Sequence, residues 1–222
     1  MIKMIVYTVD HGEYITMEES LKRQPQGKRN LYVNLTNRCT CSCTFCLRSL
    51  KEMGESMSLW LKEEPSVELV KKELDRAPWD FIKEVVFCGF GEPTMRLAEL
   101  KELLAYVKQT HRAVTTRLNT NGLSDLDHGR DTSSEFEGGI LDTISISLNA
   151  SNAERYLELT RSRFGLQSYE AMLDFAEHCK AYVPHVVLTI VDQVEGPQEI
   201  EKCRAICAAR GLTLRVRPYE AN

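Results

Sequence analysis

The sequence lacks the surplus of positive charge and the long apolar run that would indicate nucleic acid or a membrane as a partner. Its 28 Lys and Arg against 32 Asp and Glu leave a formal net charge of -4, so no general positive field attracts polyanions or acidic lipids. No run of about eighteen apolar residues is present, and the N-terminal stretch has no secretory signal pattern. We therefore expect a cytoplasmic protein with neither a nucleic-acid nor a membrane partner.

The chain also lacks any linker rich in Pro, Gly or Ser, any internal repeat and any charge block that would divide it. Its 222 residues, 43% of them apolar, are enough for one ordinary globular domain with its own core. The polar, turn-prone segment KRQPQGKRN ends residues 1–29, which we interpret as an N-terminal extension. Residues 30–222 are expected to form the main domain.

From Leu31 onward, segments with strand character alternate with segments with helix character. The alternation makes six strand-plus-helix units of roughly 32 residues, which is too few for a closed barrel of eight strands. The predicted strands are 31–37, 84–88, 114–120, 143–148, 185–191 and 213–217, and the predicted helices are 65–75, 97–109, 168–182 and 197–209.

Most of these strands alternate between apolar and polar residues, whereas a strand covered by helices on both faces would be apolar throughout. The segment 143–148 is the clearest case, and its polar face continues through Ser145, Ser147 and Asn149. If helices cover the apolar face, the polar face lines an interior that should hold a polar ligand. We therefore predict an α/β fold, a partial (β/α)6 barrel of parallel strands, over a doubly wound sheet. An antiparallel sheet with one wet face would show the same alternation but would leave little room for the helices.

Eight cysteines in a protein expected in a reducing compartment indicate metal or redox chemistry more than disulfides. The segment NLTNRCTCSCTFC places Cys39, Cys43 and Cys46 in C-x3-C-x2-C spacing at the carboxyl end of the first predicted strand, where parallel sheets carry their sites. Three thiolates on a short loop suit a [4Fe-4S] cluster with one iron left without a protein ligand. A closed zinc site needs four ligands, usually as two pairs, and no second pair with zinc spacing is present. Cys41, inside the loop, is interpreted as a bystander.

This spacing, with Phe45 before the last cysteine, resembles the cluster motif of the radical S-adenosylmethionine (SAM) superfamily. The segment FCGFGEPT resembles the GGE motif of that superfamily, carried here by Gly89, Gly91 and Glu92 with a phenylalanine in place of the middle glycine. LNTNG and SISLNA resemble the ends of its third and fourth strands, and the similarity spans residues 31–218. The phrases LTNRC, CGFGEPT, LNTNG and HGRD are most similar to those of the TatD-associated radical SAM proteins.

The resemblance implies an enzyme with a TIM-barrel-like fold that binds a [4Fe-4S] cluster and SAM. In the superfamily, an electron cleaves SAM reductively, and the resulting 5′-deoxyadenosyl radical abstracts hydrogen from the substrate. The resemblance also implies a small-molecule or peptide substrate and an electron donor such as flavodoxin or ferredoxin. The implied iron ligands are Cys39, Cys43 and Cys46, and the implied cofactor-binding residues are Gly89, Gly91, Glu92, Asn121, Ser147 and Asn149.

Strand alternation also directs four arginines toward the polar interior, while it supplies few carboxylates there besides Glu92. Unpaired guanidinium groups in a partly desolvated cavity are costly, so they should meet an anion. We therefore expect the unidentified substrate to be anionic. The four are Arg38, Arg117, Arg215 and Arg217.

Three other functions fit part of the pattern. A glycyl-radical activating enzyme shares the cluster and the barrel but acts on a large protein partner. A synthase similar to 7-carboxy-7-deazaguanine synthase has a magnesium-binding side chain just after its last cluster cysteine, where this chain has Leu47. A non-catalytic iron-sulfur or zinc-binding protein would need no SAM pocket, and both GFGEPT and the polar strand faces argue against it.

The remaining motifs carry weaker expectations. HGRD, residues 128–131, is expected on a polar loop beyond the third strand, either over the site or as a solvated turn. Cys88 and three helix cysteines are expected to be small buried apolar residues. These three are Cys179, Cys203 and Cys207.

Overall fold

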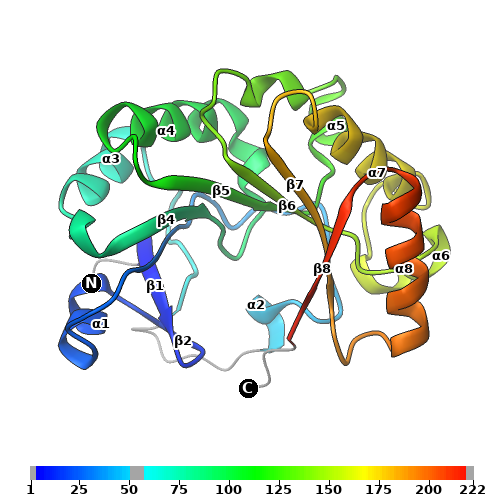
Figure 1. Ribbon diagram of the computed structural model, residues 1–222, viewed down its shortest axis with the longest axis horizontal. Helices are drawn as coiled ribbons and strands as arrows, with labels where there is room; N and C mark the ends of the chain where they lie inside the picture. Colours follow the sequence, from blue (N-terminus) through cyan, green and yellow to red (C-terminus); the bar gives the residue numbers. More distant parts are fainter. Residues whose placement is uncertain (1–3, 51–57, 219–222) are drawn as a thin grey trace.

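The centre of the molecule is one curved sheet of eight strands, seen in a computed structural model that describes residues 4–50 and 58–218 (Figure 1). The strands are β1 (Val6–Asp10), β2 (Glu13–Ile15), β3 (Arg29–Val33), β4 (Ile82–Phe87), β5 (Thr115–Thr120), β6 (Thr143–Ser147), β7 (His185–Val191) and β8 (Thr213–Arg217). Their order is β2-β1-β3-β4-β5-β6-β7-β8, and each neighbouring pair from β3 to β8 is parallel. The sheet curves without closing, so the predicted α/β partial (β/α)6 barrel is confirmed.

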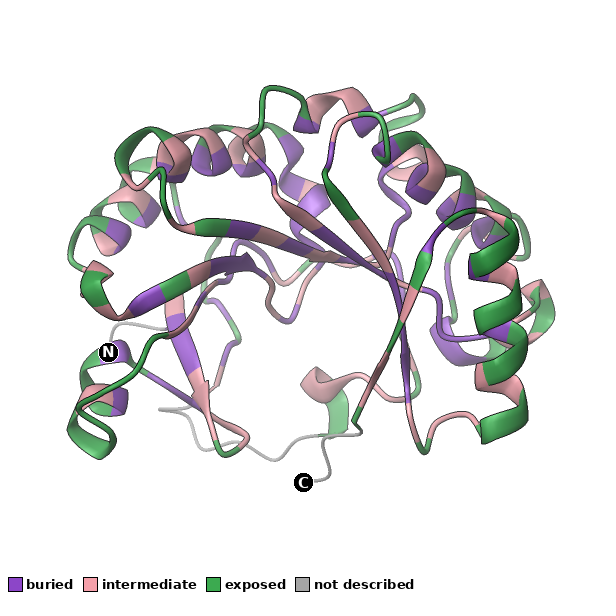
Figure 2. Ribbon diagram, in the orientation of Figure 1, coloured by how far each residue is buried: buried purple, intermediate pink, exposed green. Residues whose placement is uncertain are grey.

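The longer helices cover the convex face of this sheet, with their buried residues turned toward the strands, whereas the short α2 lies on the concave side (Figures 1 and 2). The longer helices are α3 (Val67–Asp75), α4 (Leu97–Thr110), α6 (Ala153–Thr160), α7 (Gln167–Cys179) and α8 (Pro197–Ala209). The short ones are α1 (Met17–Arg23), α2 (Leu47–Leu50), α5 (Ser124–His128), η1 (Trp79–Phe81), η2 (Pro93–Arg96) and η3 (Ser133–Phe136). Within the described ranges, the helices are too short or too polar to cross a membrane.

The hydrophobic core lies between these helices and the apolar face of the strands. In α4, Leu100, Leu103, Leu104 and Val107 are fully buried, at the spacing that places residues on one helix face. On the strand side, Ile144 and the other apolar residues of β6 are also fully buried. The sheet therefore presents its apolar face to the helices and keeps its polar face for the concave side.

The predicted boundaries hold best at the carboxyl end of the chain, where β7, β8 and α8 have the predicted ranges. The first predicted strand, 31–37, ends early at Val33. The Asn34 side chain donates a hydrogen bond to the Leu59 carbonyl oxygen (2.6 Å), and the chain leaves the strand ladder there. The pattern does not anticipate α6 or the strands and helix of the first 29 residues.

The start of α3 also differs from the predicted helix 65–75. Ser66 is the N-cap, because its hydroxyl oxygen accepts a hydrogen bond from the Leu69 amide, so Pro65 precedes the cap and does not open the first turn. The stretch 47–61, expected to be irregular, begins with α2, and its residues 51–57 lie outside the described residues.

The N-terminal extension contributes two antiparallel strands to the sheet. β1 pairs with β3 and with β2, and the β1–β2 turn places His11 and Gly12 at φ values of 47° and 78°. Two consecutive residues with positive φ are typical of the tight turn that matches strand twist in a hairpin. Segments of five and three residues carry too little periodicity to be recognised as strands in the sequence.

A second, smaller core joins this hairpin to the barrel. Tyr7 of β1 stacks on Tyr32 of β3 with ring centroids 5.2 Å apart, and its hydroxyl donates to the Cys88 carbonyl oxygen (3.1 Å) just after β4. Tyr14 and Phe90 meet edge to face in the same cluster. The extension is thus packed directly against the carboxyl end of β4.

This packing predicts that Tyr7 contributes to the stability of the whole sheet. Tyr7→Ala should lower the free energy of unfolding by about 3–5 kcal/mol, because it removes a buried ring. Tyr7→Phe should lower it by only about 1 kcal/mol, because it loses one hydrogen bond. Urea unfolding followed by circular dichroism measures both values. An unchanged unfolding midpoint for Tyr7→Ala would contradict the described packing of the extension.

Candidate active site

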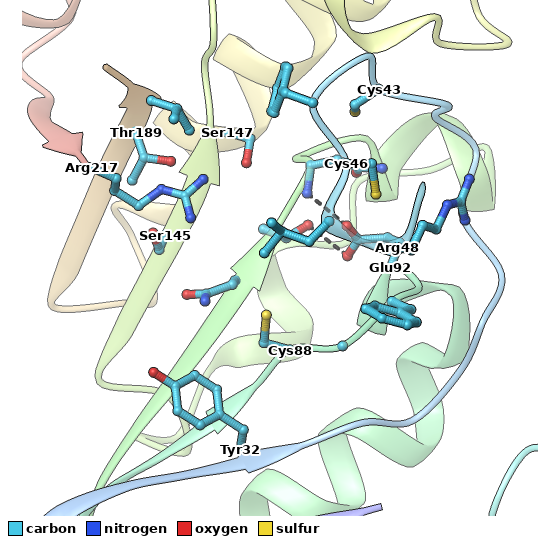
Figure 3. Close-up of a pocket in the computed structure, with 18 of the residues that line it drawn as sticks. Tyr32, Cys43, Cys46, Arg48, Cys88, Glu92, Ser145, Ser147, Thr189 and Arg217 are labelled. Carbon is cyan, nitrogen blue, oxygen red and sulfur yellow. Dashed lines mark hydrogen bonds between the residues drawn. The ribbon is translucent and has the colours of Figure 1, made fainter. Parts of the chain in front are cut away.

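The concave face of the barrel holds a pocket of about 550 Å³, which we call the inner pocket. Figure 3 shows Tyr32, Cys88, Ser147 and Arg217 around it, on different strands or just beyond their ends. The polar strand faces therefore line an interior cavity, as the alternation predicts. The polar residues of β3, β5, β6 and β8 in the lining, with the one that follows β5, are Tyr32, Arg117, Asn119, Thr120, Asn121, Ser145, Ser147, Arg215 and Arg217.

The cysteine loop follows β3 and passes along one side of this pocket. Cys43 and Cys46 line the inner pocket, whereas Cys39 lines a second hollow beside the loop. The loop is fixed to the carboxyl end of α6, because the amides of Ser42 and Thr44 donate to the last carbonyl oxygens of that helix (2.9 and 2.8 Å). The unpredicted helix α6 therefore positions the predicted cysteines.

Cys41 lies buried between two of the other thiols. A hydrogen bond from the Cys41 thiol lowers the pKa of Cys39 and the pKa of Cys43, and the same contacts raise the pKa of Cys41 itself. Burial raises the pKa of Cys46. Because the thiolate is the form that binds metal, the loop favours that form at Cys39 and Cys43 and disfavours it at Cys41.

The spacing of the sulfur atoms distinguishes between kinds of metal centre. In the described part of the chain, no three of the four loop cysteines have sulfur atoms that all lie within 4.8 Å of one another. One zinc ion would bring its ligand sulfurs within about 4.6 Å, twice a Zn–S bond of about 2.3 Å. A cluster of several irons takes each thiolate at a different iron and fits wider spacing. Among the described residues, the loop thiols therefore do not form the compact set of ligands that one zinc ion would require.

The glycines of the GFGEPT segment are required by close backbone packing. A Cβ at Gly91 would lie 2.3 Å from the Thr36 carbonyl oxygen and 2.6 Å from that of Arg38, both in the segment that leads to the cysteines. A Cβ at Gly89 would lie 2.0 Å from the Asn34 side-chain oxygen. Only glycine permits this approach, which brings the two motifs into direct contact.

The Glu92 carboxylate is buried, with a 4% exposed fraction, and joins two strand ends. One oxygen accepts from the Thr94 amide and from the Thr94 and Thr120 hydroxyls, and the other accepts from the Asn121 amide (2.7 Å; Figure 3). Burial raises the pKa of Glu92, and these hydrogen bonds oppose that rise. The side chain therefore holds the turn after β4 against the end of β5.

The other predicted cofactor-binding residues take different positions. The side-chain nitrogen of Asn121, Nδ2, faces the cysteine loop, 3.9 Å from the Cys39 sulfur and 3.7 Å from the Cys41 sulfur. Ser147 lines the inner pocket. Asn149 is buried outside the lining of the inner pocket in a left-handed conformation (φ 62°), and its side-chain oxygen has no hydrogen-bond partner among the described residues. The buried side-chain oxygen of Asn119 likewise has no hydrogen-bond partner among the described residues.

Three of the four predicted arginines line the inner pocket. Arg117 pairs with Glu84 of β4 (2.9 Å), and Arg215 donates to the Ser145 hydroxyl (3.0 Å). The buried Nε atoms of Arg117 and Arg217 have no hydrogen-bond partner. Burial lowers the pKa of Arg215, and the other two guanidinium groups lower it further.

The prediction that Arg38 points into the polar interior is wrong. Arg38 lies outside the inner pocket with 54% of its side chain exposed, and its Nε is 2.7 Å from a Glu64 oxygen. Alternation does not extend to it, because β3 ends five positions earlier, at Val33. The sequence analysis also did not identify Glu84 as a partner of the inward arginines. Glu84 pairs with Arg117, and the mostly apolar sequence of β4 has no clear alternation that would indicate this.

The weaker expectations divide in a similar way. The HGRD segment is exposed and lies outside the inner pocket, with the His128 ring nitrogen 2.8 Å from the Thr94 carbonyl oxygen and Arg130 paired with Glu135 (2.6 Å). Of the two readings, the solvated turn is therefore correct. Cys179, Cys203 and Cys207 are buried in helices, as predicted.

Cys88 was expected to be a buried apolar residue, but it is only half-buried and lines the inner pocket beside Asn119. Partial desolvation raises the pKa of its thiol. Sequence reasoning also missed Tyr7 and Tyr14 of the extension and Arg48 after the last loop cysteine, all of which line this pocket. The alternation of VYTVD was the only available signal for Tyr7. Arg48 follows no strand and carries no such signal.

Comparison with known proteins supports a family assignment. A sequence model of the radical SAM superfamily matches residues 33–204. GTP 3',8-cyclase of Corynebacterium glutamicum strain ATCC 13032 is 29% identical over 194 residues, which cover 84% of this chain and 48% of that protein. The enzyme of the same name in strain R is 32% identical over 197 residues, with the same coverage. The chain thus spans about half the length of these curated relatives.

Solved structures share the fold. SuiB of Streptococcus suis bound to S-adenosylmethionine superposes with a TM-score of 0.66 at 16% identity, covering 92% of this chain and 44% of that chain. A radical SAM methyltransferase from Sphaerobacter thermophilus superposes with a TM-score of 0.56 at 15% identity, covering 96% and 75%. At such identities the similarity establishes the fold, which is the partial barrel described above.

The close packing at Gly91 predicts a strong effect of a small side chain. Gly91→Ser should lower the free energy of unfolding by about 1–3 kcal/mol or more, because the new atoms overlap rigid backbone. Gly196→Ser is the matched control, since a Cβ there meets no atom within 4 Å, and its effect should stay within about 0.5 kcal/mol. Urea unfolding of both variants measures the difference, and an equal loss in the two would contradict the packing argument.

Proposed function

The chain belongs to the radical SAM superfamily, and we propose that it is an enzyme that abstracts hydrogen from an anionic substrate. In this proposal Cys39, Cys43 and Cys46 hold a [4Fe-4S] cluster, and SAM binds beside it in the inner pocket. The observation that carries the proposal is the placement of the cysteine loop beside a polar pocket at the carboxyl ends of parallel strands. When bound, the cluster and SAM would supply a 5′-deoxyadenosyl radical in that pocket.

The residues of the pocket fit a ligand with several hydrogen-bond donors. The side-chain oxygens of Asn119, which lines the pocket, and of Asn149, which is buried just after Ser147, have no partner, and a buried acceptor without a donor costs about 1–3 kcal/mol. The ammonium group and ribose hydroxyls of SAM are donors of the required kind. We propose that Asn149 and Ser147 bind SAM from the end of β6.

The turn that follows β4 would bind SAM through its backbone groups. Gly89 and Gly91 keep the turn free of side chains, and the Glu92 carboxylate is already occupied by its own hydrogen bonds. We therefore propose Glu92 as a positioning residue that holds the shape of this binding turn. Asn121 would act at the cysteine loop, where its amide nitrogen faces the Cys39 sulfur.

The arginines of the inner pocket support an anionic substrate. Four arginines line the inner pocket, and among its described lining residues the only carboxylate is the buried and occupied Glu92. Outside the lining, Glu84 pairs with Arg117. The unpartnered Nε atoms of Arg117 and Arg217 can each donate to an anion. Phosphate and carboxylate groups are the substrate groups that suit such planar donors.

Two more specific assignments follow from sequence similarity. We propose that the chain belongs to the TatD-associated radical SAM proteins, because its motifs LTNRC, CGFGEPT, LNTNG and HGRD are most similar to theirs. We also propose residues 30–222 as its catalytic domain with 1–29 as the extension. A cyclase acting on GTP is the second candidate, since relatives at 27–32% identity carry that name and GTP phosphates suit the arginines. The first assignment is preferred because the chain covers only about half of those relatives.

The proposed cluster is tested by anaerobic reconstitution with iron and sulfide. We expect about four irons per chain and, with SAM and dithionite, formation of 5′-deoxyadenosine. Cys39→Ala, Cys43→Ala and Cys46→Ala should each lose the iron, whereas Cys41→Ala should retain it, because Cys41 lies outside the C-x3-C-x2-C spacing of the proposed ligands. Stoichiometric zinc in anaerobically purified protein, or loss of iron in Cys41→Ala, would contradict the proposed ligand set.

The proposed anion site is tested by titrating the reconstituted protein with phosphate, pyrophosphate and GTP in a calorimeter. Arg217→Gln should weaken binding of the preferred anion at least about tenfold, because it removes a charged donor in a partly desolvated pocket. Arg112→Gln, an exposed residue outside the inner pocket, is the control and should change nothing. Equal affinities in the two variants would contradict the assignment. Tight binding of GTP alone would favour the cyclase.

A further inference from the structure

Part of the inner pocket is lined by aromatic rings that come from neighbouring elements of the sheet, and we call this part the aromatic wall. Tyr7 and Tyr14 come from the N-terminal hairpin, Tyr32 from β3 and Phe90 from the turn after β4. The proposed binding of the cluster, SAM and the anion uses none of these four rings. The aromatic wall is therefore free to contact another part of the substrate.

The rings of the aromatic wall are packed on one another before any ligand binds. Tyr7 stacks on Tyr32, with ring centroids 5.2 Å apart and an interplanar angle of 23°. Tyr14 meets Tyr7 edge to face at 5.5 Å and Phe90 at 6.4 Å. Three of the rings are buried, whereas Tyr32 is only partly buried. Tyr32 is thus the ring that the wall offers to the pocket, and the hairpin supports it from behind.

Two arginines of the pocket lie near the Tyr32 ring. Burial raises the pKa of Tyr32, and the nearby charge of Arg117 opposes that rise. Burial lowers the pKa of Arg215, and Tyr32 is close enough to oppose that change. Both arginines line the inner pocket together with Tyr32. A flat apolar surface and anion-binding groups therefore lie next to each other, with little space between them.

Tyr32 lies away from the end of the pocket where SAM would bind. In Figure 3, Cys88 lies between Tyr32 and Cys46 of the cysteine loop. SAM bound at the cluster would fill the part of the pocket beside Cys43 and Cys46. Pockets for ligands of this size have volumes of roughly 300–1,000 Å³, so SAM would take much of the inner pocket of about 550 Å³. The space that remains at the aromatic wall suits a small molecule.

We propose that the substrate is a small aromatic anion, an inference that rests on the proposed function. Its ring would stack on Tyr32, and its phosphate or carboxylate group would bind Arg117 and Arg215. Stacked aromatic pairs gain affinity beyond the area that they bury, and guanidinium groups supply planar donors for both kinds of anion. The N-terminal extension would then contribute to substrate specificity, because Tyr7 holds the Tyr32 ring in place.

The first test compares matched anions on the reconstituted wild-type protein with SAM bound, by anaerobic calorimetry. Phenyl phosphate should bind at least about threefold more tightly than cyclohexyl phosphate, because only the planar ring can stack on Tyr32. Benzoate and cyclohexanecarboxylate form the second pair, and the pair with the tighter aromatic member identifies the anionic group. Equal affinities within both pairs, or no binding of either aromatic anion, would overturn the inference.

The second test changes the ring of Tyr32. Tyr32→Leu should weaken binding of phenyl phosphate about three- to tenfold and remove its advantage over cyclohexyl phosphate. Tyr32→Phe keeps the ring and should stay within about twofold of the wild type. Tyr106→Leu is the matched control, because this tyrosine of α4 lies outside the inner pocket and bonds to Asp75. Inorganic phosphate should bind every variant equally, since the arginines are unchanged.

The outcomes separate this inference from the proposed function. If Tyr32→Leu weakened inorganic phosphate as much as phenyl phosphate, stacking on Tyr32 would be overturned. If the variant weakened SAM as much as phenyl phosphate, the aromatic wall would belong to the adenine ring of SAM, and the inference would again fail. Either result leaves the proposed enzyme intact. The proposed function fails instead if the wild-type protein forms no 5′-deoxyadenosine with SAM and dithionite.

Discussion

The whole candidate site depends on the backbone contact between the turn after β4 and the segment that leads to the cysteines. Gly91 packs against the carbonyl oxygens of Thr36 and Arg38, and the Glu92 amide donates to the Arg38 oxygen (2.7 Å). No side chain intervenes, so the two motifs pack backbone against backbone. Any ligand placed between them would meet groups whose positions are already set before it binds.

Charge is distributed around the cysteine loop in a way that the composition conceals. The chain is acidic overall, yet arginines gather in the inner pocket and again in the second hollow beside the cysteine loop, here called the outer hollow. In the inner pocket their charge is only partly offset, and desolvation makes that state costly without an anion. In the outer hollow the charge is exposed to water, where it acts over longer range and is weakened by salt.

Elements outside the six-stranded pattern complete the inner pocket and the outer hollow. Helix α6 holds the cysteine loop through Ser42 and Thr44 and ends in Arg161 of the outer hollow. The N-terminal hairpin brings Tyr7 and Tyr14 to the rim of the inner pocket. These additions are short, and they are stable only because the barrel supplies the surfaces on which they pack.

The sequence by itself determined the parallel partial barrel, its polar concave face and the grouping of the loop cysteines, because these follow from periodicity and spacing over short distances. Only the tertiary structure decided where single side chains point once a strand has ended. Arg38 turns outward to Glu64, although Arg117 on a regular strand faces inward as predicted. Cys88, the partner Glu84 and the role of the hairpin depend on contacts between residues far apart in the chain, which no local pattern records.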